Sequence, residues 1–118
     1  MVVLLNHSIF GEIFKTMNLT QQQWWSQFLT DEKGVIIDVR TEDEVNNGKI
    51  PGALNIDIYK GQGFIYQIDE LDKSKNYYVY CAAGARSANA CNIMREMGFQ
   101  NAYNLVGGFL EWDGPRED

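Results

Sequence analysis

The chain has few cysteines, a single histidine and no cluster of basic residues, and each scarcity excludes a class of protein. Two cysteines, Cys81 and Cys91, are too few for a disulfide framework, and with His7 they make no convincing zinc site. The 10 Lys and Arg residues are scattered among 16 Asp and Glu, which gives a formal net charge of −6. Nucleic acids and anionic membranes require clustered cations, so we expect neither as a partner.

Long apolar runs are also missing. The N-terminal run Val2–Leu5 is too short for the core of a signal peptide, and no Lys or Arg precedes it. No stretch approaches the length of a membrane span. We therefore expect a cytoplasmic protein with reduced thiols.

The composition is that of a globular domain, with 118 residues of which 45% are apolar and 22% charged. Proline and glycine do not gather into a linker, so residues 17–118 are expected to form one domain. Residues 1–16 are expected to be an N-terminal extension, in which Ile9–Phe10 and Ile13–Phe14 repeat one helical turn apart. Such an amphipathic extension would pack on the domain or on an oligomer partner.

Short apolar runs alternate with helical patterns along the rest of the chain. Runs of β-branched and aromatic residues predict strands at 35–40, 54–56, 77–80 and 102–105. Spacing and capping residues predict helices at 21–29, 41–45, 64–71, 87–97 and 109–112, with Thr20 and Thr41 as N-caps. This alternation predicts an open α/β fold, a mostly parallel sheet with helices on both faces. Ligands bind such sheets at the carboxyl edge.

Cys81 falls at that edge, directly after the strand at 77–80. The small residues of Ala82–Ala85 leave room for backbone N–H groups to curl inward, and Gly84 permits a left-handed step. The helix that begins near Arg86–Ser87 points its positive end toward the same place. A cysteine there should have a lowered pKa without a histidine base. The alternative is an inert structural thiol.

Four motifs in order resemble those of the rhodanese family of sulfurtransferases, over about residues 18–115. Ile37–Arg40 resembles the family's strand ending in Asp-x-Arg, and Gly48–Ile56 its Gly-His-Ile-Pro-Gly-Ala-x-Asn-Ile segment. Cys81–Ser87 resembles its Cys-x-x-Gly-x-Arg-Ser loop. Leu105–Gly108, followed by Trp112, resembles its closing motif.

The resemblance implies that Cys81 takes the outer sulfur of a donor as a persulfide and passes it to a thiol or cyanide acceptor. The donor would be thiosulfate, a small anion, or a small-molecule or protein persulfide. No metal or organic cofactor is implied. The persulfide would be bound by the loop residues Ala82, Ala83, Gly84, Ala85, Arg86 and Ser87.

The remaining site residues receive expected roles. By the same resemblance, Arg86 would hold the loop by reaching back to it or to Asp38, and Ser87 would cap the following helix. Asp38 and Arg40 are expected to form an ion pair that shapes the site. The acidic run Glu42–Glu44 is expected to be a solvated helix start.

Two departures from the family pattern bear on the substrate. Lys49 stands where the family usually has histidine, which we expect to be a surface or packing change. Ala82 and Ala83 bring no charge to the loop, whereas members that use thiosulfate well tend to carry basic residues there. A persulfide donor is therefore favoured over thiosulfate.

Three alternatives remain beside a sulfurtransferase. Cysteine-based phosphatases and arsenate reductases keep five residues between Cys and Arg, whereas this chain has only Ala82–Ala85. A binding or sulfur-carrier module without enzymatic activity would use the fold alone. A thiol redox protein would use Cys81 with Cys91, although helical spacing predicts that Cys91 is a buried, inert thiol.

Overall fold

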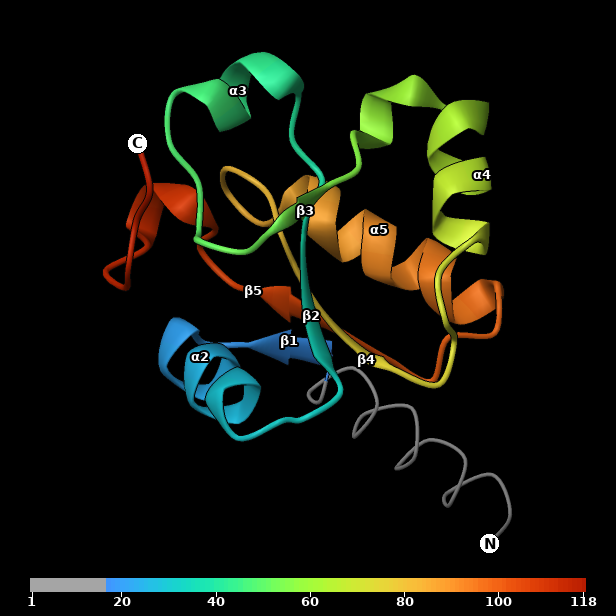
Figure 1. The fold of residues 1–118 in the computed structure, drawn as a ribbon, viewed down its shortest axis with the longest axis horizontal. Helices are drawn as coiled ribbons and strands as arrows, with labels where there is room; N and C mark the ends of the chain where they lie inside the picture. Colours follow the sequence, from blue (N-terminus) through green and yellow to red (C-terminus); the bar gives the residue numbers. More distant parts are fainter. Residues whose placement is uncertain (1–16) are drawn as a thin grey trace, which may run out of the picture.

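A parallel sheet runs through the centre of the computed structural model, which describes residues 17–118 (Figure 1). Its strands lie in the order β1-β5-β4-β2-β3, and every neighbouring pair is parallel. The strands are β1 (Asn18–Leu19), β2 (Gly34–Asp38), β3 (Leu54–Asn55), β4 (Asn76–Tyr80) and β5 (Asn101–Leu105). The predicted extension at residues 1–16 lies outside the described residues.

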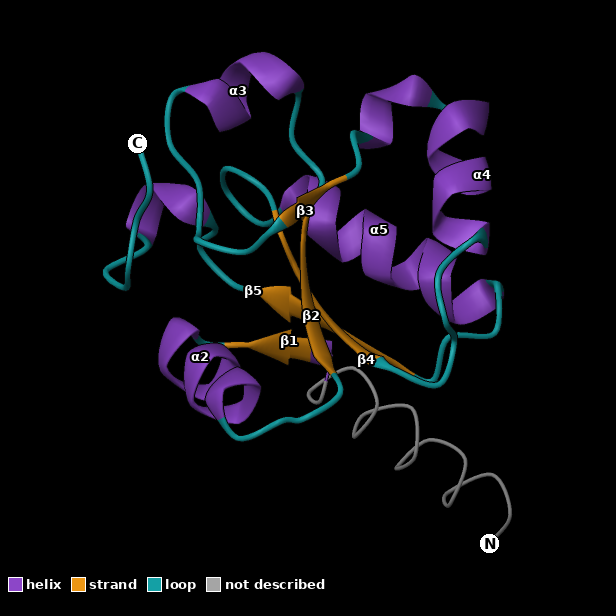
Figure 2. Cartoon of the chain, viewed as in Figure 1, coloured by secondary structure: helices purple, strands orange, loops and turns teal. Residues whose placement is uncertain are grey.

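Helices cover both faces of this sheet, with α2 on one side and α4 and α5 on the other (Figure 2). The predicted fold class is therefore confirmed. The α-helices are α2 (Gln21–Leu29), α3 (Glu42–Asn46), α4 (Gln62–Asp69) and α5 (Ala85–Glu96). Two short 3-10 helices, η1 (Ile58–Lys60) and η2 (Phe109–Glu111), follow β3 and β5.

Local sequence signals set the starts of the first two helices. Thr20 and Thr41 are their N-caps, as predicted, and each forms a reciprocal capping box with the residue three positions on, Gln23 or Glu44. The prediction missed β1, because a two-residue strand leaves no periodic pattern in the sequence.

The strand β4 shows why the core has two halves. Successive side chains of a strand point to opposite faces, so Tyr77 and Val79 pack beneath α4 and α5, while Tyr78 and Tyr80 pack on the α2 side. All four are buried because helices cover both faces. Continuing the alternation, the next residue, Cys81, belongs to the α5 side. The strand thus decides which helix the cysteine faces.

A buried ion pair braces the end of β2. Arg40 Nη2 lies 2.7 Å from Asp38 Oδ2, and the two side chains are only 5% and 1% exposed. The same nitrogen donates a hydrogen bond to the Gly48 carbonyl, and the guanidinium lies over the Tyr80 and Phe109 rings. The predicted pair is confirmed, and it lies on the α2 face of the sheet, opposite to the side chain of Cys81.

Replacing Asp38 with asparagine should destabilise the fold strongly, because it leaves the Arg40 charge buried without its partner. We expect a loss of roughly 3–5 kcal/mol in the free energy of unfolding. The matched control is Asp69→Asn, which removes the exposed i,i+4 pair with Lys73 and should cost less than about 1 kcal/mol. Urea unfolding of both variants measures the difference. Equal, small losses would contradict a structural role for the buried pair.

Candidate active site

Hydrogen-bond donors surround the sulfur of Cys81 where β4 passes into α5. The Gly84 N–H donates to Cys81 Sγ at 3.1 Å, and the Ser87 N–H donates at 3.4 Å. The Ser87 hydroxyl lies 3.3 Å from the same sulfur. This inward curl depends on Gly84, whose φ of 107° is in the left-handed region that glycine favours. The predicted amide cradle is thus present in the structure.

This cradle sets the ionisation of the thiol. Burial by itself would raise the pKa of Cys81, but hydrogen bonds from the Ser87 hydroxyl and from backbone N–H groups of the loop stabilise the thiolate. The pKa of Cys81 therefore lies below its ordinary value, as the sequence predicted. The second thiol behaves oppositely, since burial raises the pKa of Cys91 to about 12. Cys91 belongs to α5 and points into the core with no exposed surface, as predicted.

Arg86 pairs with Glu44, and the prediction that it reaches Asp38 is wrong. Its Nη1 and Nη2 lie 2.7 and 2.9 Å from the two carboxylate oxygens of Glu44, a bidentate arrangement. The Arg86 guanidinium holds the pKa of Glu44 well below its usual range, at about 2. Asp38 is already occupied by Arg40 on the other face of the sheet.

Glu44 is therefore a site residue that the sequence analysis placed in solvent. One local feature of the sequence pointed to this residue: the capping box, in which the Glu44 side chain is held against Thr41 at the start of α3. Only the tertiary structure, which places α3 beside the active loop, shows that this fixed carboxylate meets Arg86.

Ser87 does not cap α5 as predicted, because the N-cap position is occupied by Gly84. Ser87 lies in the first turn, where its hydroxyl contacts Cys81 Sγ, the Gly84 carbonyl and Asn104 Oδ1. Asn104 is a buried residue of β5 and donates in turn to Asn18 on β1. The neutral polar side chains of Ser87, Asn104 and Asn18 thus form a hydrogen-bonded series from Cys81 Sγ across β5 to β1. Sequence analysis missed Asn104, although a polar residue inside an apolar strand was a usable signal.

The segment that follows β5 packs against the active loop through backbone hydrogen bonds. Phe109 N–H donates to the Cys81 carbonyl at 2.9 Å, and Leu110 N–H donates to the Ala82 carbonyl at 3.0 Å. The two backbones approach so closely that a Cβ on Gly108 would clash with the Ala82 carbonyl. Arg40 stacks on the rings of Phe109 and of Tyr80, so the ion pair at the end of β2 packs against this segment and against the residue before Cys81.

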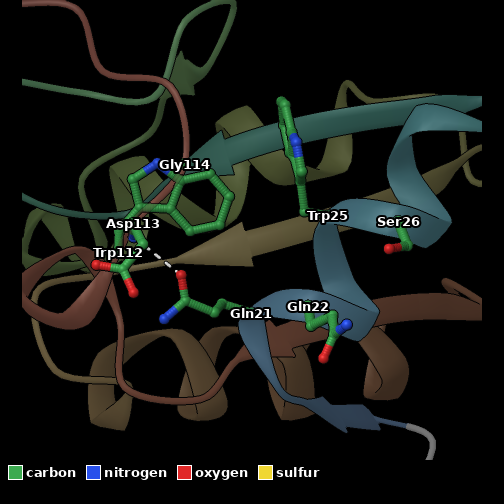
Figure 3. A pocket seen from close by; sticks show the side chains of 7 residues that line it. All are labelled: Gln21, Gln22, Trp25, Ser26, Trp112, Asp113 and Gly114. Atoms are coloured by element: carbon green, nitrogen blue, oxygen red, sulfur yellow. Dashed lines mark hydrogen bonds between the residues drawn. The ribbon is translucent and has the colours of Figure 1, made fainter.

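Two cavities lie away from the loop. The larger, of about 260 Å³, lies beside α2, where Trp25 and Trp112 meet edge to face and Gln21 accepts a hydrogen bond from the Asp113 N–H (Figure 3). The other, of about 210 Å³, lies where Lys49 pairs with the C-terminal segment. Neither is lined by any residue of the loop at 81–87. Neither cavity is therefore part of the Cys81 site.

Residues 17–118 contain no group of three or more side chains able to hold a metal ion. No helix in this described part is long and apolar enough to cross a membrane.

The protein is an α/β domain with a parallel sheet and a cysteine at the junction of a strand and a helix, and comparison with known proteins identifies its family. The model of the rhodanese-like domain family matches residues 21–114. The chain belongs to this family, as the four motifs indicated.

Several of its relatives carry sulfurtransferase names. The putative sulfurtransferase YtwF of Bacillus subtilis is 40% identical over 84 residues, which cover 71% of this chain and 78% of that protein. The thiosulfate sulfurtransferase GlpE of Shewanella oneidensis is 35% identical over 85 residues, covering 71% and 81%. A crystal structure of a rhodanese-like domain protein from Staphylococcus aureus is 30% identical, with a TM-score of 0.73, covering 85% and 95%. These relatives support sulfurtransferase activity at the level of the family.

Ser87→Ala should raise the pKa of Cys81, because it removes the hydroxyl donor while leaving the sulfur buried. At neutral pH, where less thiolate remains, alkylation by iodoacetamide should slow roughly ten-fold, the effect of one hydrogen bond to a charged group. Rates measured across pH in a Cys91→Ala background check this. The two profiles should converge once pH exceeds both thiol pKa values. A uniform loss at every pH would instead mean that Ser87 acts through access to the sulfur.

Proposed function

We propose that the protein is a sulfurtransferase that carries sulfane sulfur as a persulfide on Cys81. The observation that carries the proposal is the set of donors around Cys81 Sγ, which lowers its pKa and is suited to an anionic sulfur. A thiolate is the nucleophile in sulfur exchange, so by lowering the pKa of Cys81 the cradle favours the reactive form without a histidine.

The reaction proceeds in two displacements. With thiosulfate as donor, the Cys81 thiolate attacks the outer sulfur, a Cys81 Sγ–S bond forms, the donor S–S bond breaks, and sulfite leaves with the electron pair. The enzyme then holds a Cys81 persulfide anion. An acceptor such as cyanide attacks the outer sulfur of that persulfide, thiocyanate leaves, and the Cys81 thiolate is regenerated.

The loop length favours sulfur over phosphate. Four residues separate Cys81 from Arg86, and the N–H groups of Gly84 and Ser87 already lie within hydrogen-bond range of the sulfur. One added sulfur atom is a smaller group than a tetrahedral oxyanion, so it suits this short loop. The Arg86 guanidinium, which would have to bind phosphate oxygens, already donates from both Nη atoms to Glu44. The cytoplasm is the compartment in which we expect this chemistry.

Cys81→Ser should abolish sulfur transfer while the fold remains. The measurement is intact mass after incubation with thiosulfate or a persulfide, followed by cyanide and a thiocyanate assay. The wild type should gain the mass of one sulfur and lose it on cyanide addition. The control, Cys91→Ala, should retain transfer. Turnover by Cys81→Ser would refute the assignment, and a large loss in Cys91→Ala would favour a redox pair of thiols.

Arg86→Ala should impair transfer more than Lys49→Ala, because Arg86 belongs to the loop and ties it to α3. Lys49 forms a looser, partly exposed pair with Glu117 at 4.0 Å, at a cavity that the loop does not line. The loss for Arg86→Ala should be roughly ten-fold or more in kcat/KM, as for a bidentate charged hydrogen bond. Steady-state kinetics of both variants measure it, and the reverse order would contradict the assigned role of Arg86.

A further inference from the structure

We infer that the outer face of the active loop docks a partner protein whose cysteine persulfide is flanked by apolar side chains. The inference rests on the proposed function and specifies its donor. It begins with large hydrophobic side chains that the fold leaves in solvent beside the nucleophile.

Two large exposed hydrophobic residues contact the loop directly, and a third lies next to residues that do. Leu110 is 76% exposed, and its N–H donates to the Ala82 carbonyl. Tyr59 is 69% exposed, and its ring lies 5.3 Å from the Arg86 guanidinium carbon. Single exposed hydrophobics are ordinary, but a group of them around a reactive atom indicates an interaction surface.

Val106 is the third member of the group and is 50% exposed. Its neighbours in sequence lie against the loop, since a Cβ on Gly84 would meet Gly107 N at 3.5 Å and Leu105 O at 3.6 Å. The loop adds the exposed Ala83 and Ala85 to the same surface.

We call these residues the collar. They come from η1, the active loop and the segment after β5, so only the tertiary structure brings them together. The collar residues are Tyr59, Ala83, Ala85, Val106 and Leu110.

The charges at the collar disfavour a dianionic donor such as thiosulfate. Arg86, the cation of the loop, is neutralised by Glu44 in a bidentate pair. The carboxylate of Glu111 lies beside the collar as well, 2.9 Å from the position of a Cβ on Gly107. A partner that is apolar at its centre and neutral or basic at its edge complements this surface.

The burial of Cys81 Sγ restricts the shape of the donor that can reach it. Cys81 is only 1% exposed, so the sulfur-bearing end of the donor has to be narrow while the rest of the donor contacts the collar. The side chain of a cysteine persulfide has this shape. The Cys81 thiolate attacks the outer sulfur of R–S–SH, the Cys81 Sγ–S bond forms, the partner's S–S bond breaks, and R–S⁻ leaves with the electron pair. Cys81 is left as a protonated persulfide, and no oxidant or reductant is needed.

The test compares three donors: a short peptide persulfide flanked by leucines, the same peptide flanked by glutamates, and thiosulfate. The rate of sulfur loading on Cys81, followed by intact mass, gives a second-order rate constant for each. We expect the wild type to load from the leucine peptide roughly ten-fold faster than from the glutamate peptide, as for the burial of one leucine side chain.

The variants replace the collar without adding charge. Leu110→Gln combined with Val106→Thr should slow loading from the leucine peptide roughly ten-fold and leave the thiosulfate rate unchanged. The matched control is Leu29→Gln, since Leu29 is 62% exposed at the end of α2 and is not part of the collar. It should change no rate.

Failure of the inference is distinguishable from failure of the proposed function. Loading of Cys81 without preference for the leucine peptide, or equal losses in the collar and Leu29 variants, overturns the inference alone. A dimer that dissociates in the Leu110→Gln, Val106→Thr variant would show that a second copy covers the collar, which also overturns it. No loading of Cys81 from any of the three donors would overturn the proposed function itself.

Discussion

The site depends on one set of hydrogen bonds, those that the loop and the first turn of α5 direct at Cys81 Sγ. A thiol this deeply buried would ordinarily stay protonated, because burial disfavours the charged form. The Ser87 hydroxyl and the N–H groups of Gly84 and Ser87 outweigh that penalty only because all converge on one atom. The close approach of Gly108 to Ala82 holds the loop from the other side, so the glycines are as necessary as the donors.

Arg40 and Arg86 lie in different parts of the fold and have different roles. Arg40 and Asp38 project to the α2 face, where their buried pair braces β2 and the ring of Phe109. Arg86 and Glu44 lie at the active loop, where a carboxylate from α3 takes up the charge of the loop cation. The division reflects the elements involved, since Asp38 belongs to strand β2 whereas Glu44 and Arg86 belong to helices α3 and α5. It leaves the cysteine in a cradle of neutral donors, which suits sulfur better than a phosphate dianion.

The two cysteines show how far residue type alone can mislead. Cys81 and Cys91 lie ten positions apart in the sequence, and both are buried. The pKa of Cys91 is raised to about 12 because burial is not compensated by donors, while the pKa of Cys81 is lowered by the cradle. The sequence predicted this contrast correctly, because the small residues after Cys81 and the helical position of Cys91 are both local features.

Local features are what the sequence by itself determined: the caps Thr20 and Thr41, the alternation of strands and helices, and the position of Cys81 at a strand end. Each depends on residues close together in the chain, through backbone hydrogen bonds and side-chain periodicity. The tertiary structure alone decided that Glu44 meets Arg86, that Asn104 lies behind Ser87, and that exposed side chains from three segments form the collar. The Glu44–Arg86 and Ser87–Asn104 contacts join residues 42 and 17 positions apart. Such pairings depend on how helices pack over the sheet, and a long-range contact leaves no periodic pattern in a single sequence.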